Sequence, residues 1–478
     1  MTKPLKIFLF VLGASAAALV AIVVGLLLFF DINRYKPEIE AKVSSVLGMQ
    51  VAVEGKLALA LSPGFRVTLQ NVRIRNRDTD LAFVPAVDVA IPFLALLGEE
   101  VRPSDITAKG ARILIERNRA GKYNYEKLPS DVDRSRPLNL PKVAFRDLTV
   151  VYSDQQPEDR LELNRCDGEL NDMQNPGGEP LLKHLSLNGA FKCDELKGPG
   201  TDKNRVVTDV KFNVVAKAGI FDIDPITVKA YGGLGTAKIR VDRSLDVPTI
   251  SLSATLPKFR VESLLRPTAS GKSLSGLLTF SANLSMSGST RLAMRQSAHG
   301  DMSLSGTALK LSGVDLDQQL QKFELSQNLN LLDVGALLFV GPISFVVTKG
   351  AELANLAQPT SSGTSIRNVI SRWKLEKGVA HAVDVGLTTN ENRLAVQGDL
   401  NFVSDQYQDI IVALIDENGC AKARQKVSGP FAKPIADQSN ILLPVGPLLR
   451  LLDSAKALLS GGRGKCEVFY SGSLPSPA

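Results

Sequence analysis

Apolar and polar residues alternate along most of the chain, which is the pattern of strands with one buried face. The first clear example is a pair of short alternating runs on either side of a Pro-Gly turn signal, with apolar positions at Leu57, Leu59, Phe65, Val67 and Leu69. These runs predict two strands joined by a tight connection. The next apolar pair is Val72 and Ile74, so the phase slips by one residue. A slip of one residue reverses the two faces, and we therefore expect a bulge at residues 70–71.

Strand-like segments continue almost to the end of the chain. They are predicted at residues 112–116, 143–152, 206–216, 226–230, 237–241, 277–286, 302–311, 343–347, 394–402 and 410–415. Several begin near a glycine that is followed at two-residue steps by apolar residues, at Gly55, Gly276, Gly300 and Gly398. Such a glycine is typical of a turn or bulge at the start of a half-buried strand. The repetition indicates strands added one after another to a long sheet.

Helical spacing is found in only a few places outside the N-terminus. Residues 33–47 predict a short helix that stops at Gly48, and Asp315 is placed to cap a second one through residue 323. A third is expected at residues 447–460, before two glycines. The fold class predicted from the sequence is therefore mainly β, with a few short helices.

One segment is far more hydrophobic than the rest. Residues 7–30 contain no charged residue and no proline, and as a helix they would measure roughly 36 Å, enough to cross a membrane core of about 30 Å. Lys3 and Lys6 precede the segment, whereas the charges that follow nearly cancel, which favours a cytoplasmic N-terminus. A cleaved signal peptide is the alternative. The bulky residues before Asp31 lack a small-x-small cleavage site, so an uncleaved anchor is favoured.

Composition and charge narrow the classes of function. The chain has 478 residues, 44% of them hydrophobic and 22% charged, with a net charge of +7. The basic residues are scattered singly, without a basic block or a basic–aromatic stripe, which argues against a nucleic-acid partner. There are only three histidines, which leaves little material for a metal or acid–base site.

Catalytic motifs are incomplete wherever they begin. The Gly271-Lys272-Ser273 triplet lacks the first glycine of a phosphate-binding loop, and residues 232–235 lack the third glycine of a dinucleotide fingerprint. Ser371 and Lys374 have the spacing of an acyl-serine pair, but the companion S-D-N motif is missing and Thr348-Lys349-Gly350 precedes the pair in the wrong order. The sequence predicts no enzyme, no metal site and no cofactor.

The four cysteines are Cys166, Cys193, Cys420 and Cys466. They form two pairs that are local in sequence, without the spacing of a zinc site or a redox motif. In a translocated domain we expect disulfides 166–193 and 420–466, although four cysteines allow three connectivities. Four buried free thiols are the alternative.

A long sheet with one apolar face cannot leave that face in water, so it must close on itself, be covered, or curve into a trough for apolar ligands. Few helices are available to cover it. The candidate lining residues are the apolar strand positions Leu57, Leu59, Phe65, Val67, Leu69, Leu278, Phe280, Leu284, Met302 and Leu304. Ordinary core packing is the alternative role for each of them.

Two parts of the chain resemble a known family. Residues 31–76 contain, in order, Tyr35-Lys36-Pro37, a Gly48 turn, the strand Val53-x-Gly55-x-Leu57, Pro63 and the ending Val72-x-Ile74-x-Asn76. This series resembles the opening of the AsmA family of bacterial envelope proteins. Residues 300–320 (GDMSLSGTALKLSGVDLDQQL), 392–402 and 420–470 resemble its C-terminal module, and residues 77–297 are similar in style only.

The resemblance implies a single-pass anchor in the bacterial inner membrane, with a cytoplasmic N-terminus and a periplasmic body. It also implies an elongated, curved, repeating β-sheet groove, related to bridge-like lipid-transfer proteins. The corresponding domains are residues 1–30 (anchor), 31–130 (N-terminal module), 131–297 (middle β region) and 298–478 (C-terminal module). The expected partners are phospholipid, the inner membrane and other envelope proteins.

Two functions remain open at this point. The first is a non-enzymatic protein that binds lipid acyl chains in the groove and supports phospholipid transport or outer-membrane assembly. The second is a structural or interaction protein that affects outer-membrane protein assembly without carrying lipid.

Overall fold

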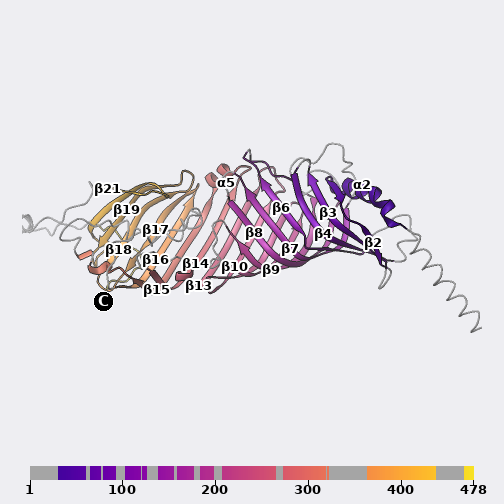
Figure 1. The fold of residues 1–478 in the computed structure, drawn as a ribbon. Helices are drawn as coiled ribbons and strands as arrows, with labels where there is room; N and C mark the ends of the chain where they lie inside the picture. Colours follow the sequence, from indigo (N-terminus) through magenta and orange to yellow (C-terminus); the bar gives the residue numbers. More distant parts are fainter. Residues whose placement is uncertain are drawn as a thin grey trace, which may run out of the picture.

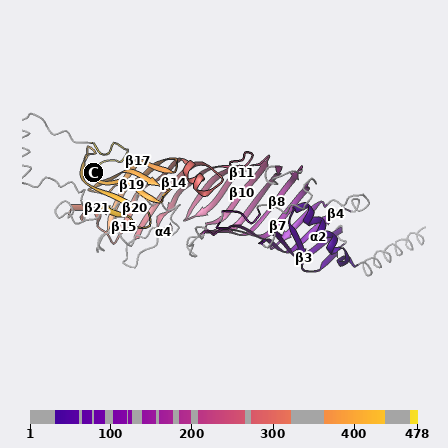
Figure 2. The same cartoon turned by 90° about the horizontal axis from the view of Figure 1, so that it is seen from above.

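A computed structural model describes residues 31–60, 65–76, 79–92, 103–119, 121–125, 138–155, 159–176, 184–198, 207–264, 273–318, 320–321, 363–437 and 468–477. These residues form one sheet of 21 strands. In Figures 1 and 2 the strands follow one another along the long axis of the molecule in the order of the sequence. The prediction of a mainly β protein built on one long sheet is confirmed.

The first half of the sheet consists of β1 (Gln50–Val53), β2 (Leu57–Ala60), β3 (Phe65–Asn76), β4 (Thr79–Ile91), β5 (Asp105–Lys109), β6 (Arg112–Arg117), β7 (Leu138–Asp154), β8 (Asp159–Asn175), β9 (Ser186–Lys197), β10 (Val207–Lys217) and β11 (Ile220–Ala230). The second half consists of β12 (Gly233–Asp242), β13 (Thr249–Arg260), β14 (Ser273–Ser287), β15 (His299–Ser312), β16 (Thr364–Glu376), β17 (Val379–Thr388), β18 (Arg393–Asn401), β19 (Gln406–Ile415), β20 (Ala421–Pro430) and β21 (Ile435–Asp437).

Strand pairing follows chain order almost throughout. From β7 to β21 each strand pairs antiparallel with the next. At the N-terminal end β1 and β2 both pair with β3, and β5 and β6 both pair antiparallel with β4 and parallel with β7. Because antiparallel neighbours need only short turns, a chain of this order can extend a sheet in one direction without crossovers.

The phase slip expected at residues 70–71 is present, but the expected bulge is not. Gln70 pairs with Ala86 and Val72 with Val84, so β3 gains no extra residue there relative to β4, and their register shifts only between Ile74 and Arg75. Asn71 adopts a left-handed backbone conformation with φ of 53°. On either side of it, Leu69 and Val72 are both buried in the same hydrophobic cluster although they are three residues apart. The left-handed residue therefore corrects the phase, so that the apolar positions before and after it share one face.

The described helices are short. The 3₁₀ helix η1 (Ile32–Tyr35) runs into α2 (Lys36–Leu47), which ends at Gly48 with φ of 67°, as predicted. Two others are α4 (Val261–Leu264) and α5 (Arg291–Ser297), and residues 316–318 and 320–321 are also helical. Asp315 accepts a hydrogen bond from Gln318 N at 2.9 Å, in agreement with its predicted capping role.

Three predicted elements lie outside the described residues: the membrane helix at residues 7–30, the strand at 343–347 and the helix at 447–460. Within the described ranges no helix has both the length and the hydrophobicity needed to span a membrane.

Helix α2 covers the free edge of the sheet at its N-terminal end. The outward N–H groups of Val51 and Val53 donate to Ser44 Oγ at 2.9 Å and to Glu40 Oε1 at 2.6 Å. Asn33 Oδ1 accepts from Leu57 N at 2.9 Å. Side chains of η1 and α2 thus satisfy edge groups that would otherwise be available for pairing with another strand.

The apolar side chains of the sheet form two large clusters, one after the other along its length. The N-terminal cluster extends from β1 to β10 and includes Val53, Leu148 and Val210. The C-terminal cluster extends from Phe259 to Phe431 and includes Trp373 at its centre. A third, small cluster lies where residues 468–477 pack on β18 and β19.

Candidate functional site

One face of the sheet carries an unbroken row of apolar residues that runs across the strands. Each member is directly opposite the next in the strand register, from β10 to β16. We call this the central row, and it consists of Phe212, Ile226, Ala237, Ala254, Ala282, Met302 and Trp373. A second apolar row runs beside it, one same-face position along each strand: Val214, Ile223, Ile239, Leu252 and Leu284.

The opposite face of the same strands is polar. Arg240 pairs with Asp222 at 2.8 Å, and Lys238 pairs with Asp224 at 2.8 Å. The hydrogen bond from Lys238 to Asp224 raises the pKa of the lysine and keeps it charged. Ser281 and Ser303 hydrogen-bond to each other at 2.7 Å farther along. Because successive side chains of a strand point to opposite faces, the sheet separates an apolar face from a charged one.

Part of the apolar face is left half-exposed. Between the two large clusters, a set of apolar residues of β10–β13 belongs to neither cluster and is only half-buried. We call this set the window, and it consists of Val214, Ile223, Ile226, Ala237, Ile239, Leu252 and Ala254. Several apolar side chains side by side and accessible to solvent mark a binding surface in soluble domains.

The two ends of the window differ in structure. At the N-terminal end the rings of Phe191 and Phe212 stack with centroids 5.2 Å apart, and the ring of Phe145 lies tilted against Phe191 with centroids 6.1 Å apart. At the C-terminal end the members of the central row become buried, since Met302 is 7% exposed and Trp373 is 1% exposed. The same apolar face is therefore accessible in β10–β13 and buried at Met302 of β15 and Trp373 of β16.

The predicted lining residues lie on this apolar face, mostly inside the two clusters. Seven of them are buried, namely Leu57, Val67, Leu69, Leu278, Phe280, Met302 and Leu304. Three are half-buried at the margins of the clusters, namely Leu59, Phe65 and Leu284. Whether any of them contacts lipid stays a prediction.

Sequence reasoning missed the window itself. Its residues show the same alternation as the predicted lining, for example Ala237, Ile239 and Val241 between charged residues. The alternation identifies the apolar face, but it does not identify which part of that face the rest of the chain leaves uncovered.

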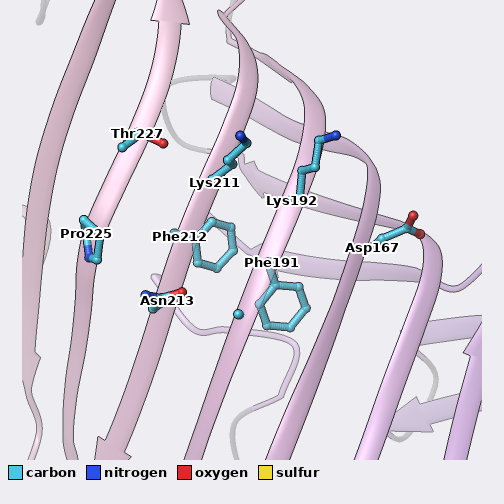
Figure 3. Close-up of a pocket in the computed structure, with 9 residues that line it drawn as sticks. Asp167, Phe191, Lys192, Lys211, Phe212, Asn213, Pro225 and Thr227 are labelled. Atoms are coloured by element: carbon cyan, nitrogen blue, oxygen red, sulfur yellow. The ribbon is translucent and has the colours of Figure 1, made fainter.

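A hollow of about 420 Å³ lies on β8–β11 next to the window. Figure 3 shows Lys192 and Lys211 side by side on adjacent strands, with Phe191 and Phe212 below them. The two lysines are directly opposite in the register, next to Asp167 and Thr227. The lysines alternate with the two phenylalanines along their strands, so they belong to the charged face of the sheet.

The comparison with protein families is decisive for the identity of the fold. The model of the AsmA family matches residues 1–177 and 183–383, which is well over half of the chain. The chain belongs to the AsmA family. The match includes the middle β region, where the sequence shows strand patterns similar to those of the family but no ordered series of its motifs. No curated protein matches the chain.

The AsmA-family match ends before the last part of the sheet. It includes residues 300–320, as the resemblance implied, but not residues 392–402 or 420–470. For those two segments the resemblance to the family's C-terminal module stays a prediction.

One predicted disulfide of this AsmA-family chain is confirmed. Cys166 and Cys193 lie directly opposite each other on β8 and β9 and are bonded. Both are buried in the N-terminal cluster, beside the aromatic stack that ends the window. Cys420 is also disulfide-bonded, and Cys466, its predicted partner, lies outside the described residues.

The spacing of Ser371 and Lys374 does not produce a catalytic pair. Ser371 is fully buried on the apolar face of β16 and accepts a hydrogen bond from Trp373 Nε1 at 2.7 Å. Lys374 is exposed on the other face and pairs with Glu376 at 2.7 Å. A base must lie within hydrogen-bond reach of the hydroxyl, and these two groups are on opposite sides of the sheet.

Proposed function

We propose that this protein binds phospholipid acyl chains on the window and supports phospholipid transport or outer-membrane assembly in the bacterial envelope. In this role it acts without catalysis. Residues 7–30 anchor it in the inner membrane and the sheet lies in the periplasm. The observation that carries the proposal is the set of half-buried apolar residues that lies side by side across four neighbouring strands and belongs to neither hydrophobic cluster.

The energetics favour a hydrocarbon ligand. Each methylene group removed from water contributes about 0.8 kcal/mol, so ten methylenes in contact with the window would contribute on the order of 8 kcal/mol before the costs of binding. The window residues carry no polar side-chain atoms that would need hydrogen bonds. A ligand with a long apolar part and a polar end fits such a surface, since the polar end can stay in water.

The test is a comparison of two charge variants in the full chain, purified from membranes in mild detergent. Leu252→Glu places a carboxylate in the window, and Thr255→Glu places one on the exposed, opposite face of the same strand. Co-purifying phospholipid is extracted and quantified by mass spectrometry, and thermal unfolding is recorded for each variant.

We expect the Leu252→Glu protein to retain at least tenfold less lipid than the wild type, and the Thr255→Glu protein to retain the wild-type amount. A wild-type protein that carries no phospholipid, and takes up none when it is offered, would refute the proposal. That result would favour the interaction protein that works without lipid.

A further inference from the structure

We infer that the window holds one phospholipid at a time, with an acyl chain lying along the central row, and that the apolar face does not continue as a lipid track toward the C-terminal end. The inference rests on the proposed function and adds to it the capacity and the orientation of the ligand.

The first argument is that the protein itself closes the C-terminal end of the window, while the stacked rings of Phe191 and Phe212 mark its N-terminal end. Ala254 of β13 is half-buried, whereas Ala282 of β14, the next residue of the central row, is only 4% exposed. The residues that follow in the row, Met302 and Trp373, are members of the C-terminal cluster. A hydrocarbon chain lying on Ala254 therefore meets a closed core one strand farther on.

The closure is built from residues that lie after β15. Val314, Leu316 and Leu320 are 0–2% exposed and belong to the same cluster. Polar contacts hold this segment in place, because Thr364 Oγ1 donates to Val314 O at 2.9 Å and Asn392 Nδ2 donates to Asp317 Oδ1 at 2.8 Å. The seal is thus part of the folded C-terminal half.

The second argument is the length of the window. The stretch from Phe212 to Ala282 covers four strand spacings, which is about 19 Å at about 4.8 Å per strand. One leaflet of a bilayer has a hydrocarbon thickness of about 15 Å, half of the core of about 30 Å. The stretch accommodates one acyl chain of a membrane phospholipid and is too short for two placed end to end.

The third argument is the shape of the row inside the window. Ala237 and Ala254 are directly opposite each other, and the second row beside them carries Ile239 and Leu252. Side chains stand roughly perpendicular to a sheet, so two alanines next to larger residues form a shallow depression in the apolar surface. The depression runs across the strands, and this direction sets the orientation of the acyl chain that lies in it.

The experiment uses the full chain in detergent and titrates it with dipalmitoyl phosphatidylethanolamine, followed by native mass spectrometry. We expect saturation at one lipid per chain. In the Ala254→Phe variant, whose phenylalanine fills the shallow depression, we expect the lipid to bind at least tenfold more weakly. The matched control is Thr255→Phe, on the neighbouring position of the opposite face, for which we expect wild-type binding.

A second measurement needs no variant and stays informative if Ala254→Phe does not fold. A phosphatidylethanolamine with a diazirine in its acyl chain is cross-linked to the wild-type protein, and the labelled peptides are sequenced. We expect label in β11–β13 and none at Met302, Trp373 or Leu400.

The outcomes separate this inference from the proposed function. Two or more lipids per chain at saturation, or label at Met302, Trp373 or Leu400, would overturn the single-lipid site while leaving lipid binding intact. Wild-type binding by Ala254→Phe, with its fold preserved, would overturn the placement along the central row. Absence of any bound lipid would overturn the proposed function itself.

Discussion

Gly168 of β8 lies directly opposite Phe191 of β9, and a Cβ atom at position 168 would overlap the phenylalanine ring. The absence of a side chain at Gly168 is what allows the ring to lie flat and stack on Phe212. The glycine therefore builds the aromatic end of the window although it contributes no contact surface of its own.

We predict that Gly168→Ala destabilises the protein by about 1–3 kcal/mol, because an added methyl in a packed site forces its neighbours to move. Chemical denaturation of the full chain in detergent measures the effect. Lys192→Ala, which alters the exposed neighbour of Phe191 on the opposite face, is the control and should change the stability by less than about 0.5 kcal/mol. Equal changes in stability for the two variants would show that the Phe191 ring can accommodate the added methyl group without cost.

The cross-strand disulfide gives a second prediction. Cys166 and Cys193 are 27 residues apart in sequence, and cross-linking a loop of that size stabilises a protein by about 3.5 kcal/mol in the chain-entropy model. The double variant Cys166→Ala/Cys193→Ala should lose most of this stability in denaturant unfolding. Adding a reductant should destabilise the wild type more than this variant, and identical responses would contradict a structural role for the bond.

The edge cap provided by α2 can be removed. In the Glu40→Ala/Ser44→Ala variant the N–H groups of Val53 and Val51 lose their acceptors. We expect a loss of about 1–3 kcal/mol and the appearance of dimers or larger species in detergent, measured by light scattering, because an uncapped edge pairs with other strands. Glu38→Ala, on the exposed side of α2, should remain like the wild type. A variant that keeps the wild-type mass and stability would show that the cap is dispensable.

Asp384 fastens residues 468–477 to the sheet. It is 4% exposed and accepts hydrogen bonds from Tyr470 Oη, from Arg372 and from Ser473 Oγ, the last at 2.7 Å. Burial by itself raises the pKa of this carboxyl, but the hydrogen bonds outweigh it, so the pKa lies below its ordinary value. The charged form is therefore the one that the folded protein prefers.

The sign of the pH effect follows from this shift. An unfolded aspartate binds its proton near pH 4, and Asp384 in the folded protein binds it only at a lower pH. The stabilisation is thus complete above about pH 5 and is lost as the pH falls through the lowered pKa. We expect the C-terminal residues to become sensitive to an acid protease as the pH falls below about 4 and through the lowered pKa of Asp384.

An Asp384→Asn variant distinguishes the contribution of the Asp384 carboxylate to the acid sensitivity from the contributions of other titrating groups. It should lose part of the attachment already at neutral pH, by about 1–3 kcal/mol, and its C-terminal residues should show a weaker pH dependence. An unchanged pH profile in this variant would assign the acid sensitivity to other groups.

Much of the fold could be predicted from local patterns. Alternation located most strands, and the phase slip located the left-handed residue Asn71, although the register of β3 with β4 shifts farther on, between Ile74 and Arg75. Gly276 and Gly398 were predicted to mark a turn or a bulge, and the register does shift beside both of them. These features depend only on neighbouring residues, so the sequence displays them directly.

The extent of the accessible face could not be predicted in this way. Leu252 and Leu304 have the same alternating surroundings, yet one is half-buried and the other is 3% exposed. The difference depends on what packs above them, and residues such as Leu316 and Leu320 reach the C-terminal cluster only through the fold. The alternation therefore identified the apolar face, and most of the predicted lining residues lie in buried parts of that face.

The most direct test of lipid binding by the window is site-specific photo-cross-linking in living cells. A benzophenone amino acid replaces Ile239, in the window, or Lys238, its neighbour on the charged face. The account predicts that radiolabelled phospholipid becomes attached to the protein with the probe at position 239 and not with the probe at position 238. Equal labelling at both positions, or none at position 239, would contradict it.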